Sequence, residues 1–75
     1  MSIKRKFGEQ IVKLRKRNSL SEEKIAKDLG ITQQSLNLYE NGKRSPNLEM
    51  ICKLAEYFNI SLDYLVGRID NSDER

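Results

Sequence analysis

The 75 residues are enough for one domain, and a domain of this size buries only about 60% of its unfolded surface, which leaves little chain to line an enzyme pocket or a small-molecule site. One cysteine and no histidine exclude an internal disulfide and a readable zinc site, so no metal or cofactor is predicted. Lys and Arg number 14 against 11 Asp and Glu, a net charge of +3, and no apolar run approaches the roughly 18 residues of a membrane span, so we expect a cytoplasmic protein with no membrane partner.

The first predicted helix is strongly basic and ends near Arg17. Its apolar residues recur at helical spacing at Phe7, Ile11 and Leu14. Glu9 is the one acidic residue among the first 17, where the basic residues are Lys4, Arg5, Lys6, Lys13, Arg15, Lys16 and Arg17. Such a patch indicates a polyanionic partner, although a solvated helix face explains a run of charges equally well.

Two short helices with a tight turn between them are predicted next. Ser21 is the N-cap of the second helix, and Gly30 ends it in a left-handed conformation. The buried stripe of this helix consists of Ile25, Ala26 and Leu29. Ile31 closes the gap beneath the turn, and Thr32 caps the third helix. This pattern is typical of a helix-turn-helix, whose second helix enters the major groove of DNA.

The third predicted helix carries amide side chains along one side. At about 100° per residue, one arc of about 140° holds five residues, namely Gln33, Gln34, Asn37, Leu38 and Asn41. The opposite side holds Thr32, Leu36 and Tyr39. Gln and Asn present a donor and an acceptor in one plane, which matches N6 and N7 of adenine. A single amide is an ordinary surface residue, but four on one arc favour base reading.

Two further helices complete an all-α domain. Asn47 caps the fourth helix and Ser61 caps a short fifth helix that ends at Gly67. The side chains expected to point inward from the fourth are Leu48, Ile51, Leu54, Ala55 and Phe58. No stretch alternates long enough for a strand. We therefore expect a compact five-helix domain over residues 1–68, followed by a disordered polar tail over residues 69–75.

Three segments resemble the phage-repressor or xenobiotic-response-element type of helix-turn-helix domain. They are residues 30–36 (Gly-Ile-Thr-Gln-Gln-Ser-Leu), 39–46 (Tyr-Glu-Asn-Gly-Lys-Arg-Ser-Pro) and 54–65 (Leu-Ala-Glu-Tyr-Phe-Asn-Ile-Ser-Leu-Asp-Tyr-Leu). The resemblance implies a lambda-repressor-like fold with the helix-turn-helix at helices two and three. It also implies a sequence-specific transcriptional regulator, most simply a repressor that binds double-stranded DNA at a palindromic operator as a homodimer.

The same resemblance implies a role for individual residues. The base-reading residues would be Gln33, Gln34, Asn37 and Leu38. The phosphate-contacting residues would be Thr32, Asn41, Lys43, Arg44 and Arg15. Arg15 and Glu40 match a buried ion pair that links the first helix to the end of the third; a free basic side chain is the alternative for Arg15.

The C-terminal helix suggests a dimer interface. Its apolar residues lie on more than one side, which leaves area that a small monomer cannot easily cover. We expect the contact around Tyr64, Val66 and Ile69, whereas the alternative is that these residues complete the core of one chain.

Two residues depart from the family pattern. Glu22 stands where the family usually has a glutamine that bonds a phosphate and braces the first reading glutamine, and a carboxylate repels phosphate. Leu38 is apolar where the family is commonly polar. Both favour the rival hypothesis, a protein-interaction module of antitoxin-like or anti-repressor-like kind that keeps the fold with weak or no DNA binding.

Overall fold

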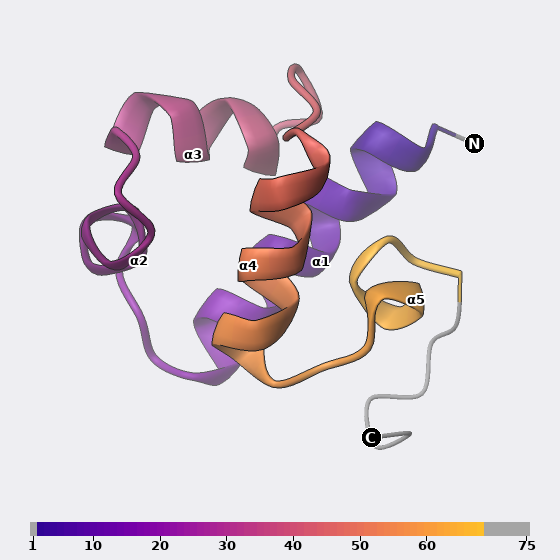
Figure 1. Ribbon diagram of the computed structural model, residues 1–75. Coiled ribbons are helices and arrows are strands. Elements are labelled where there is room, and N and C mark those ends of the chain that lie inside the picture. Colours follow the sequence, from indigo (N-terminus) through magenta and orange to yellow (C-terminus); the bar gives the residue numbers. More distant parts are fainter. Residues whose placement is uncertain (1, 69–75) are drawn as a thin grey trace.

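A computed structural model describes residues 2–68 as one bundle of helices, and Ile69 and the polar tail lie outside the described residues. The five helices in this range are α1 (Ile3–Arg17), α2 (Glu22–Leu29), α3 (Gln33–Glu40), α4 (Leu48–Phe58) and α5 (Leu62–Leu65). Figure 1 shows α2 and α3 together on one side of α1 and α4, with α5 on the other side. The predicted all-α, five-helix fold is confirmed.

Each of the five helices within residues 2–68 begins with a side-chain N-cap. The side chain of the N-cap residue accepts a hydrogen bond from the backbone N–H three residues later, as predicted for Ser21, Thr32, Asn47 and Ser61. Ser2 does the same for α1, which begins a full turn before Phe7, where the apolar pattern starts. Each such cap contributes about 1 kcal/mol and satisfies a donor that the helix cannot.

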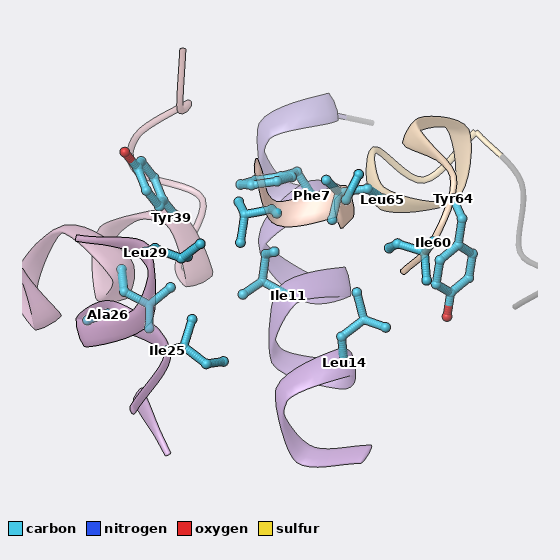
Figure 2. Packing of buried hydrophobic residues seen from close by; sticks show 13 residues of the cluster. Phe7, Ile11, Leu14, Ile25, Ala26, Leu29, Tyr39, Ile60, Tyr64 and Leu65 are labelled. Atoms are coloured by element: carbon cyan, nitrogen blue, oxygen red, sulfur yellow. The ribbon is translucent and has the colours of Figure 1, made fainter. Parts of the chain in front are cut away.

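The core forms where α1 faces the other helices. Figure 2 shows Phe7, Ile11 and Leu14 along α1, with side chains of α2 and α3 on one side and those of the α5 region on the other. The buried apolar residues are Phe7, Ile11, Leu14, Ile25, Ala26, Leu29, Leu36, Tyr39, Leu54, Ala55, Ile60, Tyr64 and Leu65. The Phe7 and Tyr39 rings meet edge to face at 6.3 Å, which ties α1 to the end of α3.

Leu48 corrects the expected core. It is 76% exposed, because it is the first residue of α4 and the buried residues of that helix, Leu54 and Ala55, lie in its second half. Among residues 2–68, no helix is both long and apolar enough to cross a membrane.

Tyr64 corrects the expected dimer interface. Its side chain is only 1% exposed, and its hydroxyl accepts a hydrogen bond from Arg17 Nη2 at 3.0 Å. Its backbone carbonyl accepts a bond from Gln10 Nε2 at 2.8 Å. Tyr64 thus completes the core of the single chain, because its ring is buried and both its hydroxyl and its carbonyl are bonded to side chains of α1. Val66 is half-buried.

Candidate nucleic-acid interface

The turn between α2 and α3 fixes the angle at which α3 leaves the bundle. Gly30 adopts φ 77° and ψ 28°, a left-handed conformation that costs glycine no steric strain. The Ile31 N–H donates to the Ala26 carbonyl at 3.0 Å, and the Ile31 side chain packs against the core. The chain then enters α3 at once through the Thr32 cap.

The two sides of α3 differ as the helical wheel predicts. Leu36 and Tyr39 are buried, while Gln33, Gln34 and Asn37 are exposed. Leu38 is half-buried, so it lies at the edge of the exposed face and not fully on it. The structure therefore brings the predicted amides together on one accessible surface.

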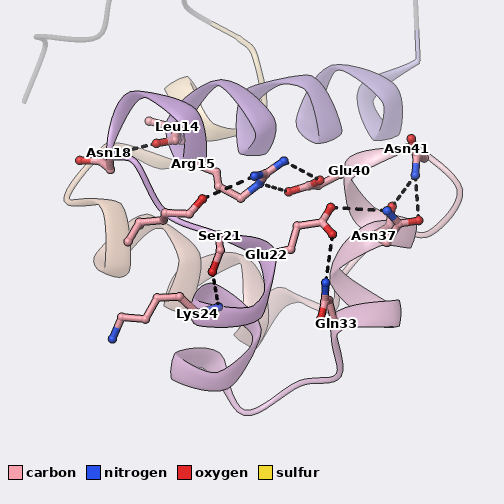
Figure 3. A network of polar contacts seen from close by, with 11 residues as sticks. Leu14, Arg15, Asn18, Ser21, Glu22, Lys24, Gln33, Asn37, Glu40 and Asn41 are labelled. Atoms are coloured by element: carbon pink, nitrogen blue, oxygen red, sulfur yellow. Dashed lines mark hydrogen bonds and ion pairs between the residues drawn. The ribbon is translucent and has the colours of Figure 1, made fainter.

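The Glu22 carboxylate organises two of these amides. Figure 3 shows it between Gln33 and Asn37, from the first turn of α2. Its Oε1 accepts from Gln33 Nε2 at 3.5 Å, and its Oε2 accepts from Asn37 Nδ2 at 3.4 Å. Asn41 Nδ2 in turn donates to the Asn37 carbonyl at 2.9 Å and to Asn37 Oδ1 at 3.0 Å. Three amides and one carboxylate thus form a continuous polar network along α3.

A second carboxylate lies behind the first. Hydrogen bonding with Glu40 lowers the pKa of Glu22 below its ordinary value, and the amides of Gln33 and Asn37 lower it further. Burial raises the pKa of Glu40, and its contact with Glu22 raises it again, since two close carboxylates resist double ionisation. Glu22, the more exposed of the two carboxylates, therefore gives up its proton more readily than Glu40.

The ion pair between Arg15 and Glu40 is present. Arg15 Nε donates to Glu40 Oε2 at 2.7 Å and Nη2 to Oε1 at 3.4 Å, a two-pronged contact (Figure 3). Nη1 donates to the Leu20 carbonyl at 3.4 Å. Because the guanidinium is engaged on all three nitrogens and its side chain is 18% exposed, the phosphate contact also expected of Arg15 is not supported.

The remaining residues predicted to contact phosphates differ in the contacts they make within the chain. Arg44 Nη1 donates to Ser35 Oγ at 3.3 Å, and Ser35 Oγ also accepts from the Thr32 hydroxyl at 3.0 Å. This places a loop cation beside the N-terminal end of α3, where the helix dipole favours anions. Lys43 is exposed. Asn41 is exposed and its amide nitrogen donates to Asn37, and its phosphate contact stays a prediction.

Gly8 and Gln10 are positioning residues that the sequence analysis missed. A Cβ on Gly8 would lie 2.5 Å from the Tyr39 carbonyl oxygen and 2.6 Å from that of Glu40, so only glycine lets α1 approach the end of α3 this closely. Gln10 is buried and joins α1 to the Tyr64 carbonyl. A glycine in mid-helix was a readable signal, since it costs about 1 kcal/mol relative to alanine and needs a packing reason.

The comparisons with known proteins agree with this geometry. A sequence model of the helix-turn-helix family matches residues 11–65. The chain belongs to the helix-turn-helix family. The chain is 38% identical over 60 residues to YonR, a prophage-derived transcriptional regulator of Bacillus subtilis, covering 80% of this chain and 56% of YonR.

Two further proteins extend the comparison. The phage CTXphi transcriptional repressor RstR of Vibrio cholerae is 33% identical over 70 residues, which cover 92% of this chain and 63% of RstR. The crystal structure of the restriction-modification controller protein C.AhdI from Aeromonas hydrophila superposes with a TM-score of 0.74 at 33% identity, covering 81% of this chain and 92% of that one. The resemblance to phage repressors and the lambda-repressor-like fold are confirmed. The chain spans between half and two thirds of the length of YonR and RstR.

Proposed function

We propose that this chain is a sequence-specific DNA-binding module that regulates transcription, most simply as a repressor, with α3 in the major groove. The observation that carries the proposal is the exposed amide face of α3, held at a fixed angle by the α2–α3 turn and the Arg15–Glu40 ion pair. Amide side chains are suited to base edges, and a rigid support reduces the cost of holding them in place.

Base reading and phosphate binding are assigned to different residues. Gln33, Gln34 and Asn37 read bases, and Leu38 contacts a thymine methyl group from the edge of the same face. Thr32, Lys43 and Arg44 bind phosphates, because they lie at the N-terminal end of α3 or in the loop after it. Phosphate contacts hold the register of the protein on DNA and carry no sequence information.

The test is selection of bound fragments from random DNA, followed by mobility shifts over a range of salt. Gln33→Ala should cost about 1–3 kcal/mol on the selected site and little on random DNA. Arg44→Ala should weaken both equally and reduce the salt slope by about one. Binding of Gln33→Ala that equals the parent on every sequence would show that α3 does not read bases. No selective binding at all would favour the protein-interaction module.

We also propose that the chain binds a palindromic operator as a homodimer. Leu62, the first residue of α5, is 45% exposed, and Val66, its C-cap, is half-buried, so α5 retains apolar area on the surface besides the buried Tyr64. A two-fold contact there would present two reading helices to half-sites about one turn of DNA apart. Sedimentation should show a concentration-dependent dimer that Leu62→Lys weakens, and monomers at every concentration together with one chain per operator would contradict it.

A further inference from the structure

Three amides along the reading surface, those of Gln33, Asn37 and Asn41, donate in one direction. Gln33 Nε2 and Asn37 Nδ2 both donate to the Glu22 carboxylate, and Asn41 Nδ2 donates to Asn37 Oδ1. The nitrogen of each amide therefore faces into the network. The amide carbonyl oxygens of Gln33 and Asn41 are left to face other partners.

The chemistry of Glu22 imposes this direction. An ionised carboxylate only accepts hydrogen bonds, whereas a glutamine at the same place could accept through its oxygen or donate through its nitrogen. Hydrogen bonding with Glu40 lowers the pKa of Glu22, so the carboxylate is ionised at neutral pH. Gln33 and Asn37 cannot turn their oxygens toward it without placing acceptor against acceptor.

Gln33 is left with a restricted choice of base. An amide nitrogen carries two protons, and one of those on Gln33 is given to Glu22. One N–H and the carbonyl oxygen remain, which together match the N7 acceptor and N6 donor of adenine. Guanine presents two acceptors, N7 and O6, so one of them would face the Gln33 oxygen.

We propose that Glu22 is a specificity-determining positioning residue, which fixes the orientation of the Gln33 amide so that the reading helix accepts adenine and rejects guanine at one position of the site. The inference rests on the proposed function. The Glu22 carboxylate should also lower the affinity for all DNA, because it repels the phosphate backbone regardless of sequence.

The experiment compares three variants on the selected site with either A·T or G·C at the position that Gln33→Ala identifies. Glu22→Ala removes the acceptor and the charge. Glu22→Gln removes the charge but keeps an acceptor that can also donate. Glu23→Gln is the matched control, because it removes a charge from the same helical turn at an exposed residue.

The expected results separate specificity from affinity. Glu22→Ala should reduce the preference for adenine over guanine about tenfold, the loss of one well-formed base contact. Glu22→Gln should tighten binding to every sequence by a similar factor, with an intermediate base preference. Glu23→Gln should leave the preference unchanged. In a Gln33→Ala background, Glu22→Ala should no longer change the preference.

Each failure has a distinct meaning. An unchanged adenine preference in Glu22→Ala overturns the inference while the proposed function stands. If the parent protein selects no DNA sequence, the inference about Glu22 and the proposed function are both contradicted. Thermal unfolding verifies that each variant is folded. If Glu22→Ala does not fold, Glu22→Met is measured in its place, because methionine has a similar length and no charge.

Discussion

The two sides of α3 are built in opposite ways. The inner side meets α1 at a joint where the Gly8 backbone touches the last turn of α3 and Arg15 Nε lies 2.7 Å from Glu40 Oε2. The outer side carries exposed amides whose bonds to Glu22 are 3.4–3.5 Å long. The joint thus sets where α3 lies, while the outer side sets what it recognises. Substitutions at the joint should change stability, and those on the outer side should change binding.

Among substitutions where α1 meets α3, the largest effect is expected from Gly8→Ala. Alanine normally stabilises the middle of a helix by about 1 kcal/mol relative to glycine. Here the new Cβ would lie 2.5 Å from the Tyr39 carbonyl oxygen, a backbone atom that moves only if the two helices separate. We expect a loss of about 3 kcal/mol in the free energy of unfolding, measured in urea.

Gly30→Ala is the matched control for this substitution. A Cβ at Gly30 meets no atom within 4 Å, so the cost there comes only from its φ of 77°. That cost should be about 1–2 kcal/mol. A Gly8→Ala protein as stable as the parent would show that α1 and α3 are not held closely together.

The second prediction concerns the Arg15–Glu40 pair. Arg15→Ala should cost about 2 kcal/mol, less than a fully buried pair because the Arg15 side chain keeps some contact with water. Adding Glu40→Gln should restore part of that loss, since no buried charge is then left without its partner. A double-mutant cycle with no coupling energy would contradict the prediction.

The pH dependence of Arg15→Ala follows from Glu40. Burial raises the pKa of this carboxyl above 4.5, and loss of the arginine raises it further. A raised pKa in the folded state means that the cost of burying the charge is present at neutral pH. This cost disappears as the pH falls through the folded pKa toward 4.5, where the carboxyl is protonated in both states. The deficit of Arg15→Ala relative to the parent should therefore shrink in mild acid.

The sequence predicted the elements better than the contacts between them. Caps, the Gly30 stop and the two-sided pattern of α3 are local, and each was predicted from a few neighbouring residues. The Arg15–Glu40 pair came only through the resemblance to the phage-repressor family. Gly8 and Gln10 were missed because their role depends on residues 31 to 54 positions away along the chain. The orientation of the Gln33 amide likewise depends on a residue of another helix.

Leu38 tests the boundary between the two sides of α3. It is half-buried, so Leu38→Ala should cost about 1 kcal/mol in stability. Leu36→Ala, two residues away and fully buried, should cost about 2–5 kcal/mol. On sites varied one base at a time, Leu38→Ala should also weaken the preference for thymine over cytosine at one position of each half-site. A stability loss equal to that of Leu36→Ala would make Leu38 part of the joint.

The smallest effect is expected where α2 meets α4, away from both sides of α3. The Tyr57 hydroxyl donates to Asp28 Oδ2 at 2.6 Å. Burial, and then the bond to Asp28, raises the pKa of Tyr57 to about 12 from an ordinary 10.0. Because the folded state favours the neutral phenol, its stabilising effect is complete below pH 10 and is lost as the pH rises toward 12.

The measurement for Tyr57 is urea unfolding of the parent and Tyr57→Phe at neutral pH and in this alkaline range. Phenylalanine cannot ionise, so the parent should lose stability relative to Tyr57→Phe only as the pH rises. Asp28→Asn should make that loss smaller and complete it at a lower pH, because without the carboxylate the pKa of Tyr57 in the folded state lies nearer to 10.0. DNA binding at neutral pH should be the same for the parent and both variants, since this contact supports the far end of α2 from Glu22. A change in base preference in Tyr57→Phe would mean that the reading surface is not set by the α1–α3 joint and Glu22 alone.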